Sequence, residues 1–412
     1  MKGPGGLMRI LSVNKFFWRK GGSETVFFDE MSLLTDRGHT VVPFSMKNHQ
    51  NNESEFSGYF VEEVDYEKGG LVNKLSNASK VIYSLDARNK MNALLKESQF
   101  DVAHFHIFQH QISPSVFGPL KRHDIPLVLT LHDLKPICPN YRMYVNGEIC
   151  EECRGRKFYK CTLKRCNKGS LLNSAVNSIE MYLHYALGYY QGVDQYITVS
   201  NFYRNKMIEF GFPEDRVTCI PNMIDLNGYE LAEDDDGFAL YFGRLSGEKD
   251  LDTLLEAARR IPQQRFVIAG TGPDEARYRK FIERHTMENV EFVGYQTGES
   301  LRQLIRRSAF TLLPSKWYEN CPMSVLESLG YARPVIGARI GGIPELIEDG
   351  VDGFHFSPGD AEDLAEKIRL MASLTASQRR EMGMAGRERV QKHHAPDRHY
   401  DALISVYNSV SR

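Results

Sequence analysis

The sequence predicts an α/β protein in which two doubly wound parallel sheets face each other across a cleft. Short apolar segments alternate with helical patterns along almost the whole chain, and this alternation falls into two series. Residues 226–237, which are poor in apolar side chains and contain an acidic run, separate the series. Strands that alternate with helices form parallel sheets covered on both faces. Ligands of such sheets bind at the carboxyl ends of the strands, so we expect the chemistry in the loops after strands.

The length and composition are those of an ordinary globular protein with two or three domains. The chain has 412 residues, 51 Lys and Arg against 53 Asp and Glu, and a formal net charge of −2. This excludes a disordered chain, a collagen and a disulfide miniprotein, and weighs against nucleic acid as a partner. No apolar run approaches the ~20 residues that span a bilayer. Residues 1–12 lack a secretory signal pattern, with Met8 as a candidate natural start, so we expect a cytoplasmic protein.

The first series runs from residue 9 to residue 220. Ser23 is the expected N-cap of its first helix, which ends at Gly38. A long helical pattern over residues 171–190 places Leu172, Val176 and Ile179 at three- and four-residue steps. The expected strands are residues 9–13, 40–45, 102–107, 126–132, 194–200 and 217–220.

The second series runs from residue 239 to the end of the chain. Its expected strands are residues 239–242, 266–269, 290–293, 310–313 and 334–336. Its expected helices are residues 251–261, 274–285, 301–307 and 322–331, followed by three closing helices at 361–373, 377–392 and 396–410.

Glu319 and Glu327 flank the start of one of these helices. Pro322 has no backbone N–H and fits the first helical turn, so Glu319 lies in the loop after a strand. Glu327 then lies about 1.5 turns into the helix. Free N–H groups around residues 320–323 favour an anion such as phosphate. The competing interpretation is a pair of solvent-facing carboxylates.

A basic loop follows the first strand of the second series. Arg244 and Lys249 flank a turn that contains Gly243, and a guanidinium fork with a point charge suits a diphosphate. A surface loop with two cations is the alternative. Asp250 and Asp252 have the spacing of a metal-binding Asp-x-Asp motif, but we expect Asp250 to cap the following helix instead.

Further candidates lie in loops after other strands. Gly270 and the glycine two residues later permit close backbone approach, but a third glycine is missing, which disfavours an NAD-dependent oxidoreductase. Gly21 and Gly22 precede a helix, a geometry that suits an anion, although a plain turn fits equally. His132 lies at the carboxyl end of a strand and faces the cleft, with a structural histidine as the alternative.

Five of the seven cysteines lie within 29 residues, at Cys138, Cys150, Cys153, Cys161 and Cys166. Without a secretion signal, such a cluster indicates a metal site more than disulfides. Cys150 and Cys153 form a C-x-x-C knuckle, and a hairpin turn at Asn146–Gly147 brings Cys138 back towards it. Four thiolates suit a structural zinc, which would order this loop. Free, reduced thiols are the alternative.

The same segment is basic, with seven Lys and Arg and no acid between residues 154 and 168. Charge balance and solvation are one explanation, and a patch for an anionic acceptor or membrane face is the other. The tyrosines of the helix that follows suit core packing or membrane contact, and we expect packing. They are Tyr182, Tyr185, Tyr189 and Tyr190.

Together these motifs resemble the family-4 retaining glycosyltransferases of the GT-B fold over nearly the whole chain. The matching segments are GGSE at 21–24, His132-Asp133, TVS at 198–200, IPNMID at 220–225, FGRLSGEK at 242–249, AGTGP at 269–273, the Glu319/Glu327 pair, and GGIPELI with DGVDGF within 341–354. The resemblance implies an acceptor-binding domain at residues 1–225 with a Cys-rich insert at 134–169. A nucleotide-sugar-binding domain at 226–395 and a helix at 396–412 that crosses back would follow.

The resemblance also implies residue roles. Arg244 and Lys249 would hold the donor diphosphate, and Glu327 the ribose hydroxyls. Glu319 and His132 would contact the donor sugar. Donor contacts are further implied at Gly21, Gly22, Gly243, Gly270, Gly294, Tyr295, Asn320, Cys321, Pro322 and Met323, with the base near Gly294 and Tyr295. Relatives that share the insert imply Cys138, Cys150, Cys153 and Cys166 as the zinc ligands.

The implied activity is transfer of a hexosyl or related sugar, with retention, from a UDP- or GDP-sugar to a glycan or lipid-linked acceptor. Two cations and a helix start supply positive potential for the leaving diphosphate, so we expect no catalytic metal. We expect surface-glycan synthesis in the cytoplasm, with peripheral contact on an anionic membrane face. The competing hypothesis is a zinc-stabilised sugar-nucleotide-binding protein of the same fold that has lost turnover.

Overall fold

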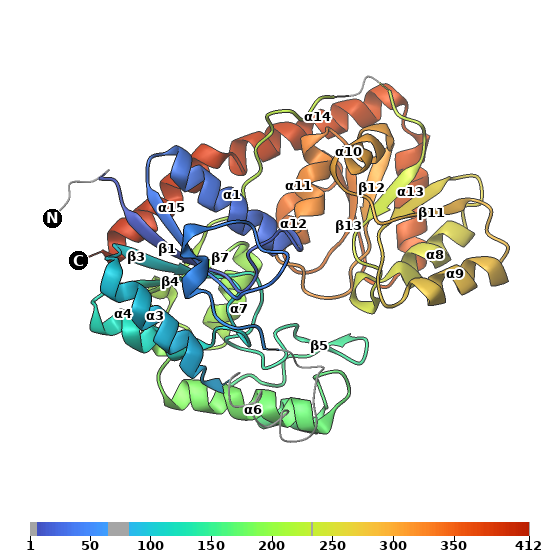
Figure 1. The fold of residues 1–412 in the computed structure, drawn as a ribbon. Coiled ribbons are helices and arrows are strands. Elements are labelled where there is room, and N and C mark those ends of the chain that lie inside the picture. Colours follow the sequence, from blue (N-terminus) through green and yellow to red (C-terminus); the bar gives the residue numbers. More distant parts are fainter. Residues whose placement is uncertain (1–5, 65–81, 232–233, 412) are drawn as a thin grey trace.

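The computed structural model describes residues 6–64, 82–231 and 234–411 (Figure 1). The first domain is built on a six-stranded sheet in the order β2-β1-β3-β4-β7-β8, in which every neighbouring pair is parallel. Its strands are β1 (Arg9–Val13), β2 (Thr40–Phe44), β3 (Val102–Phe105), β4 (Leu127–Leu131), β7 (Gln195–Thr198) and β8 (Val217–Cys219).

The second domain repeats this design with the strand order β11-β10-β9-β12-β13-β14, again all parallel. Its strands are β9 (Ala239–Phe242), β10 (Phe266–Ala269), β11 (Val290–Gly294), β12 (Phe310–Leu313), β13 (Val335–Ala338) and β14 (Gly353–Phe356). Two doubly wound parallel sheets are the predicted fold class, which the structure therefore confirms.

Helices cover both sheets (Figure 1). In the first domain they are α1 (Gly22–Asp36), α3 (Leu85–Glu97), α4 (Phe117–Arg122), α5 (Tyr159–Leu163), α6 (Leu171–Ala186) and α7 (Asn201–Glu209). The second domain has α8 (Leu251–Arg259), α9 (Glu275–Arg284), α10 (Gly298–Arg307), α11 (Met323–Gly330), α12 (Ile343–Leu346), α13 (Ala361–Ser373) and α14 (Ala376–His393). The chain closes with α15 (Pro396–Val410). In the described residues, no helix combines the length and apolarity needed to cross a membrane.

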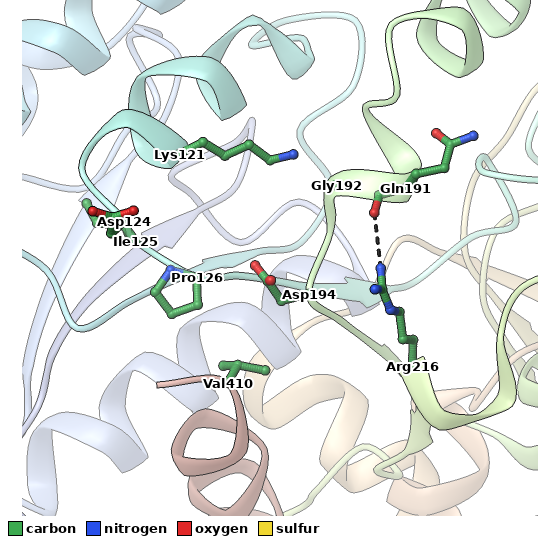
Figure 2. Close-up of a pocket in the computed structure, with 9 residues that line it drawn as sticks. All are labelled: Lys121, Asp124, Ile125, Pro126, Gln191, Gly192, Asp194, Arg216 and Val410. Carbon is green, nitrogen blue, oxygen red and sulfur yellow. Dashed lines mark hydrogen bonds between the residues drawn. The ribbon is translucent and has the colours of Figure 1, made fainter. Parts of the chain in front are cut away.

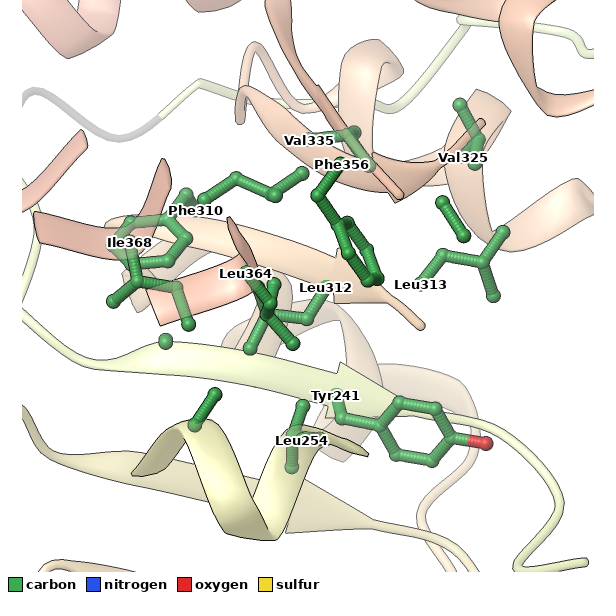
Figure 3. Close-up of a cluster of buried hydrophobic side chains, with 14 of the residues drawn as sticks. Tyr241, Leu254, Phe310, Leu312, Leu313, Val325, Val335, Phe356, Leu364 and Ile368 are labelled. Carbon is green, nitrogen blue, oxygen red and sulfur yellow. The ribbon is translucent and has the colours of Figure 1, made fainter. Parts of the chain in front are cut away.

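The core of the second domain lies between its sheet and the helices α8, α11 and α13. Figure 3 shows Tyr241 and Leu254 in the lower part of this cluster and Leu364, Ile368 and Phe356 above them. β14 supplies Phe356, although the alternation of Gly, Phe and His in this strand gave no clear strand pattern, and it was not predicted.

The first helix begins differently from the prediction. Its N-cap is Gly21, in an extended conformation, and the cap makes no side-chain hydrogen bond. Ser23 lies inside the helix, where its hydroxyl donates to the Glu24 carboxylate at 3.1 Å. The expected Ser23 cap is therefore wrong, because the Gly21–Gly22 turn places the helix start earlier.

The predicted hairpin in the Cys-rich insert is confirmed. β5 (Tyr144–Val145) pairs antiparallel with β6 (Glu148–Ile149), and Asn146 and Gly147 both have positive φ, at 54° and 89°. Two positive φ angles are the requirement of a two-residue turn of type I′.

The last helix returns to the first domain. In Figure 1, α14 runs along the second domain and α15 continues behind β1 of the first domain. Leu403, Val406 and Tyr407 pack in one cluster with Met8 and Ile10 of the first sheet.

Candidate active site

Glu319 lies at the centre of the candidate site, in the loop after β12. Its buried carboxylate accepts hydrogen bonds from Lys249 Nζ at 2.6 Å, Ser315 Oγ at 2.5 Å and Trp317 Nε1 at 2.8 Å. Burial alone would raise the pKa of Glu319, but the Lys249 charge and these donors lower it below its ordinary value. Glu319 is therefore an anion whose remaining lone pairs can accept from a hydroxyl-rich ligand.

Contacts with neighbouring segments fix the backbone of the basic loop. Leu245 N donates to Thr271 O at 2.9 Å, and Tyr241 Oη donates to Arg244 O at 2.8 Å. A Cβ on Gly270 would lie only 1.9 Å from the Gly243 carbonyl oxygen. The close backbone approach expected at Gly270 is therefore made by the chain itself.

Arg244 and Lys249 end in different environments. Lys249 is the last residue of a short 3-10 turn, Gly247–Lys249, and donates to Glu319. Arg244 is exposed, and no hydrogen bond or ion pair reaches its guanidinium from the described residues. The unpaired Arg244 guanidinium and the remaining N–H groups of Lys249, both in this loop, are available as donors for an anionic ligand.

The Asp250 cap prediction is half right. Asp250 occupies the N-cap position of α8, but its left-handed backbone directs the side chain elsewhere and it makes no cap hydrogen bond. Its carboxylate instead accepts from Thr253 Oγ1 at 2.6 Å and Lys316 Nζ at 3.1 Å. Asp252 forms an ion pair with Arg277, so the two aspartates have separate partners.

Glu327 lies on α11 and faces α1 of the first domain. Burial, with a smaller contribution from the Asp29 charge, raises the pKa of Glu327 to about 7. No described side chain donates a hydrogen bond to it. At the start of the same helices, a Cβ on Gly22 would lie 3.7 Å from Met323 Cγ. The starts of α1 and α11, which belong to different domains, therefore approach each other.

Asn320 joins the two domains, a role that the sequence did not suggest. Its Nδ2 donates to Leu131 O at 2.9 Å, and its Oδ1 accepts from Ser200 Oγ at 2.7 Å. Residue 342 next to it must be a glycine, because a Cβ there would lie 1.8 Å from the Asn320 carbonyl oxygen. The loop before α11 is thereby held against the residue that precedes His132.

His132 is neutral at physiological pH. Burial, then the neighbouring His106, lowers the pKa of His132 to about 3. Its Nε2 lies 3.0 Å from His106 Nδ1, and the two rings stack. His106 Nε2 lies 3.3 Å from Glu30 Oε1, which is also 2.9 Å from His104 Nδ1. His132 is thus held by a buried network of His106, His104 and Glu30.

Sequence reasoning missed this network, although the His-x-His pattern on β3 was a signal for it. Among the described residues, Glu30, His104 and His106 form the one group of three whose potential ligand atoms all lie within 4.8 Å of one another. Such a group can hold a cation or share protons.

Lys15 was also missed. It lies two residues after the end of β1, near the charges of Asp133 and Glu24. Burial lowers the pKa of Lys15, whereas the two carboxylates oppose that shift. The first domain therefore offers one cation and two acids near the carboxyl ends of its strands, with Glu24 on α1.

The five cysteines of the insert gather in one place. The charges of Cys138, Cys166 and Cys150 all act on Cys153, whose pKa is raised mainly by burial. A hydrogen bond from the Cys161 thiol lowers the pKa of Cys166. Cys161, which lay outside the expected ligand set, therefore belongs to the cluster. No three described sulfurs meet the 4.8 Å spacing given above.

A pocket of about 300 Å³ lies elsewhere, at the amino ends of β4 and β7 (Figure 2). Pro126, Asp194 and Val410 line it, and Arg216 donates to Gln191 O at 3.1 Å across it. Because ligands of parallel sheets bind at the opposite, carboxyl ends, we do not assign the donor to this pocket.

Comparison with solved structures identifies the same fold in other proteins. HepE of Anabaena, in complex with UDP and glucose, superposes with a TM-score of 0.67 at 18% identity, covering 98% of this chain and 100% of that one. Sucrose-phosphate synthase of Thermosynechococcus elongatus gives a TM-score of 0.74 at 17% identity, covering 98% of both chains. These likenesses show the GT-B fold.

Curated relatives align over variable lengths. A 42.6 kDa protein of the cps region of Klebsiella pneumoniae is 25% identical over 88% of this chain and 96% of its own. The putative colanic acid biosynthesis glycosyltransferase WcaL of Escherichia coli is 25% identical over 52% of this chain and 57% of its own. Sulfoquinovosyl transferase SQD2 of Arabidopsis thaliana is 33% identical over 37% of this chain, which spans only 30% of that protein.

Two family models match adjoining parts of the chain. "Glycosyltransferase Family 4" matches residues 20–227, half of the chain, and "Glycosyl transferases group 1" matches residues 228–389. The boundary between the two matches falls in the segment that separates the two sheets. The chain therefore belongs to the family-4 glycosyltransferases.

Proposed function

We propose that this protein transfers a sugar, with retention, from a nucleoside-diphosphate sugar to a glycan or lipid-linked acceptor. The observation that carries the proposal is the buried Glu319 anion held by Lys249, in the same loop that carries the exposed Arg244. This arrangement offers an acceptor for sugar hydroxyls next to cations for a diphosphate. The UDP and UDP-glucose complexes of HepE support this donor class, and a GDP-sugar fits the same groups.

In this proposal, the cationic side chains bind the donor diphosphate. Lys249 has three N–H donors and gives one to Glu319, so two remain for phosphate oxygens. Together with Arg244 and the start of α11, it supplies preorganised positive potential for the charge that grows on the leaving diphosphate. As the bond between the sugar and the diphosphate breaks, the acceptor oxygen bonds to the sugar carbon on the face that the diphosphate leaves. The departing phosphate accepts the proton of the acceptor hydroxyl. This mechanism uses no catalytic metal.

The other positions bind the rest of the donor. We assign the ribose hydroxyls to Glu327, whose carboxylate has no other donor in the described residues. Neutral His132 presents its outer ring nitrogen to the donor sugar, and the base lies near Gly294 and the exposed Tyr295. The backbone of Gly22 and of residues 320–323 completes the site at the two facing helix starts.

Turnover tests the proposal directly. Release of nucleoside diphosphate is measured with candidate sugar nucleotides for the wild type and for Lys249→Ala and Arg244→Ala. We expect losses of about 10²-fold or more, as for a removed transition-state donor. Lys280→Ala, on the outer face of α9, is the matched control. Undiminished turnover in the Lys249 variant would overturn the assignment.

We further propose that Cys138, Cys150, Cys153 and Cys166 hold a structural zinc. The mutual effects of these thiols on their pKa values support their proximity. Their chemistry fits, because a tetrahedral thiolate set is typical of structural zinc sites. The rival proposal, a zinc-stabilised binding protein without turnover, predicts that sugar nucleotides bind but are not consumed.

The family relatives named for colanic acid synthesis favour a surface glycan as the product. A lipid-linked acceptor would bring this protein to an anionic membrane face in the cytoplasm, as a peripheral protein. We propose domain boundaries at residues 225/226 and 395/396. The first is supported by the division of the strands between the two sheets, with β8 ending at Cys219 and β9 beginning at Ala239.

A further inference from the structure

Exposed apolar side chains concentrate on one small part of the surface. Fourteen large hydrophobic residues are exposed in the described part of the chain, and eight of them lie between residues 159 and 187. Leu163 and Leu172 are exposed by 67% and 64%. We call this set the apolar face, and it consists of Tyr159, Leu163, Leu171, Leu172, Ile179, Tyr182, Leu183 and Leu187. A gathering of this kind marks an interaction surface.

Helix α6 carries most of the apolar face, and it is inverted with respect to a helix on a water-soluble surface. Its leucines face outward, whereas its buried side is polar. The buried Glu180 accepts from Lys135 Nζ at 2.7 Å, Ser178 Oγ donates to Phe158 O at 2.8 Å, and His184 Nε2 lies 3.0 Å from Ile82 O. Satisfied polar contacts inside and leucines outside are the reverse of the usual arrangement.

Cations without carboxylate partners lie beside the apolar face. In the described structure, no carboxylate pairs with Lys157, Arg165 or Lys168, and Arg156 stacks over the Tyr185 ring at 4.6 Å. The other three cations of this stretch pair with Glu152 or Glu209. An apolar stripe flanked by free Lys and Arg is the pattern of a helix that lies in an anionic membrane interface.

We propose that α5 and α6 dock in the plane of an anionic phospholipid bilayer through the apolar face and these four cations. The 16 residues of α6 extend about 24 Å, which is too short to span a bilayer but long enough to lie in its interface. Nucleic acid would use the cations but not the leucines. A second copy of this chain would bring the four unpaired cations of each copy together.

The docking surface is connected to the candidate site. Tyr318, next to Glu319, donates from its Oη to Glu151 Oε1 of the insert at 2.7 Å, and Glu151 also pairs with Lys206 at 2.7 Å. Figure 1 shows α6 at the outer edge of the first domain and the β5 hairpin between it and the second domain. Resting on the proposed function, this places the cleft beside the bilayer that holds a lipid-linked acceptor.

Flotation with lipid vesicles tests the surface. The full chain is mixed with vesicles of phosphatidylcholine alone or with 30 mol% phosphatidylglycerol, where anionic vesicles should bind it about tenfold or more tightly, less so at high salt. The triple variant Leu172→Gln, Ile179→Gln, Leu183→Gln should lose binding at all salt concentrations. The double variant Lys157→Glu, Arg165→Glu should lose only the preference for anionic lipid.

Matched controls are Leu370→Gln, an exposed leucine on α13, and Lys280→Glu on α9, neither of which should change binding. Thermal unfolding of the triple variant should match the wild type, since the replaced side chains are exposed. The proposal is overturned if lipid charge does not change vesicle binding and the triple variant binds as well as the wild type. It is also overturned if the wild type forms a dimer that the triple substitution dissociates. Hydrolysis of a water-soluble donor should persist in the triple variant, so failed docking and failed sugar transfer are distinguishable.

Discussion

Helices α6 and α8 both carry an apolar and a polar face, yet they present these faces in opposite directions. α8 buries Leu251, Leu254 and Leu255 against the second sheet, in the ordinary manner. α6 buries Glu180 and His184 and exposes its leucines. The comparison teaches that a helical pattern predicts two faces without predicting which of them meets the protein.

The largest expected effect is on the free energy of unfolding, and it separates the buried faces of α6 and α8 from the exposed face of α6. Glu180→Ala removes the partner of a buried Lys135 and should cost about 3–5 kcal/mol of unfolding free energy. Leu254→Ala in α8 should cost about 2–5 kcal/mol through a core cavity. Leu183→Ala, on the exposed face of α6, should change stability by less than about 0.5 kcal/mol. Denaturant unfolding followed by circular dichroism measures all three, and a large loss in Leu183→Ala would show that its face is packed.

The insert offers the next test of this comparison, because α6 packs on a segment with little apolar content. One zinc per chain is expected by elemental analysis, and Cys153→Ser should lower that content to near zero. A chelator should then expose residues 134–169 to protease while the second domain stays protected. Cys219→Ser, in β8 outside the insert, is the control. Full protection after metal removal would argue that the thiols order the loop without metal.

A smaller effect concerns Glu327, on the second domain's side of the cleft. Its pKa of about 7 is above that of an exposed glutamate, so its contribution to stability is present below about pH 4.5 and is lost as the pH rises through 7. Glu327→Gln should therefore be more stable than the wild type at pH 8, by about 1 to 3 kcal/mol, with little difference at pH 4.5. Thermal melts at the two pH values measure this. The same variant should bind nucleotide more weakly at pH 8, and a stability difference equal at both pH values would contradict the burial explanation.

The smallest effect is expected at Asn320. Asn320→Ala removes the bonds to Leu131 O and Ser200 Oγ and should cost about 1 kcal/mol of stability. Because these bonds hold the loop against His132, KM for the donor should rise more than kcat falls. Asn227→Ala, in the segment between the sheets, is the control. An unchanged KM would show that the loop is held by its glycine packing alone.

The sequence predicted the elements far better than their mutual contacts. The bounds of β9, β10, β12, α13 and α15 agree with the structure to the residue, because each is a compact apolar run or a regular helical pattern between clear breaks. The long helix predicted over 171–190 ends at Ala186. Of its tyrosines, Tyr185 and Tyr190 pack as expected, whereas Tyr182 is exposed.

The candidate site was predictable where function lies in loops after strands, as for Glu319 and Lys249, which the structure brings to 2.6 Å. It was not predictable where contacts join distant segments. Glu30 meets His104 and His399 across 74 and 369 residues of chain. A local pattern of apolar and polar residues cannot predict such a contact, because the contact depends on how α1, β3 and α15 pack.

The return of α15 has a mechanical consequence. The chain passes between the domains twice, and the two crossings are bonded to each other: Ile224 N donates to His394 O at 2.9 Å, and His394 Nδ1 lies 2.7 Å from Asn222 O. Two bonded crossings resist a twist of one domain against the other more than a single crossing does. A single cut in either crossing would leave the two halves attached.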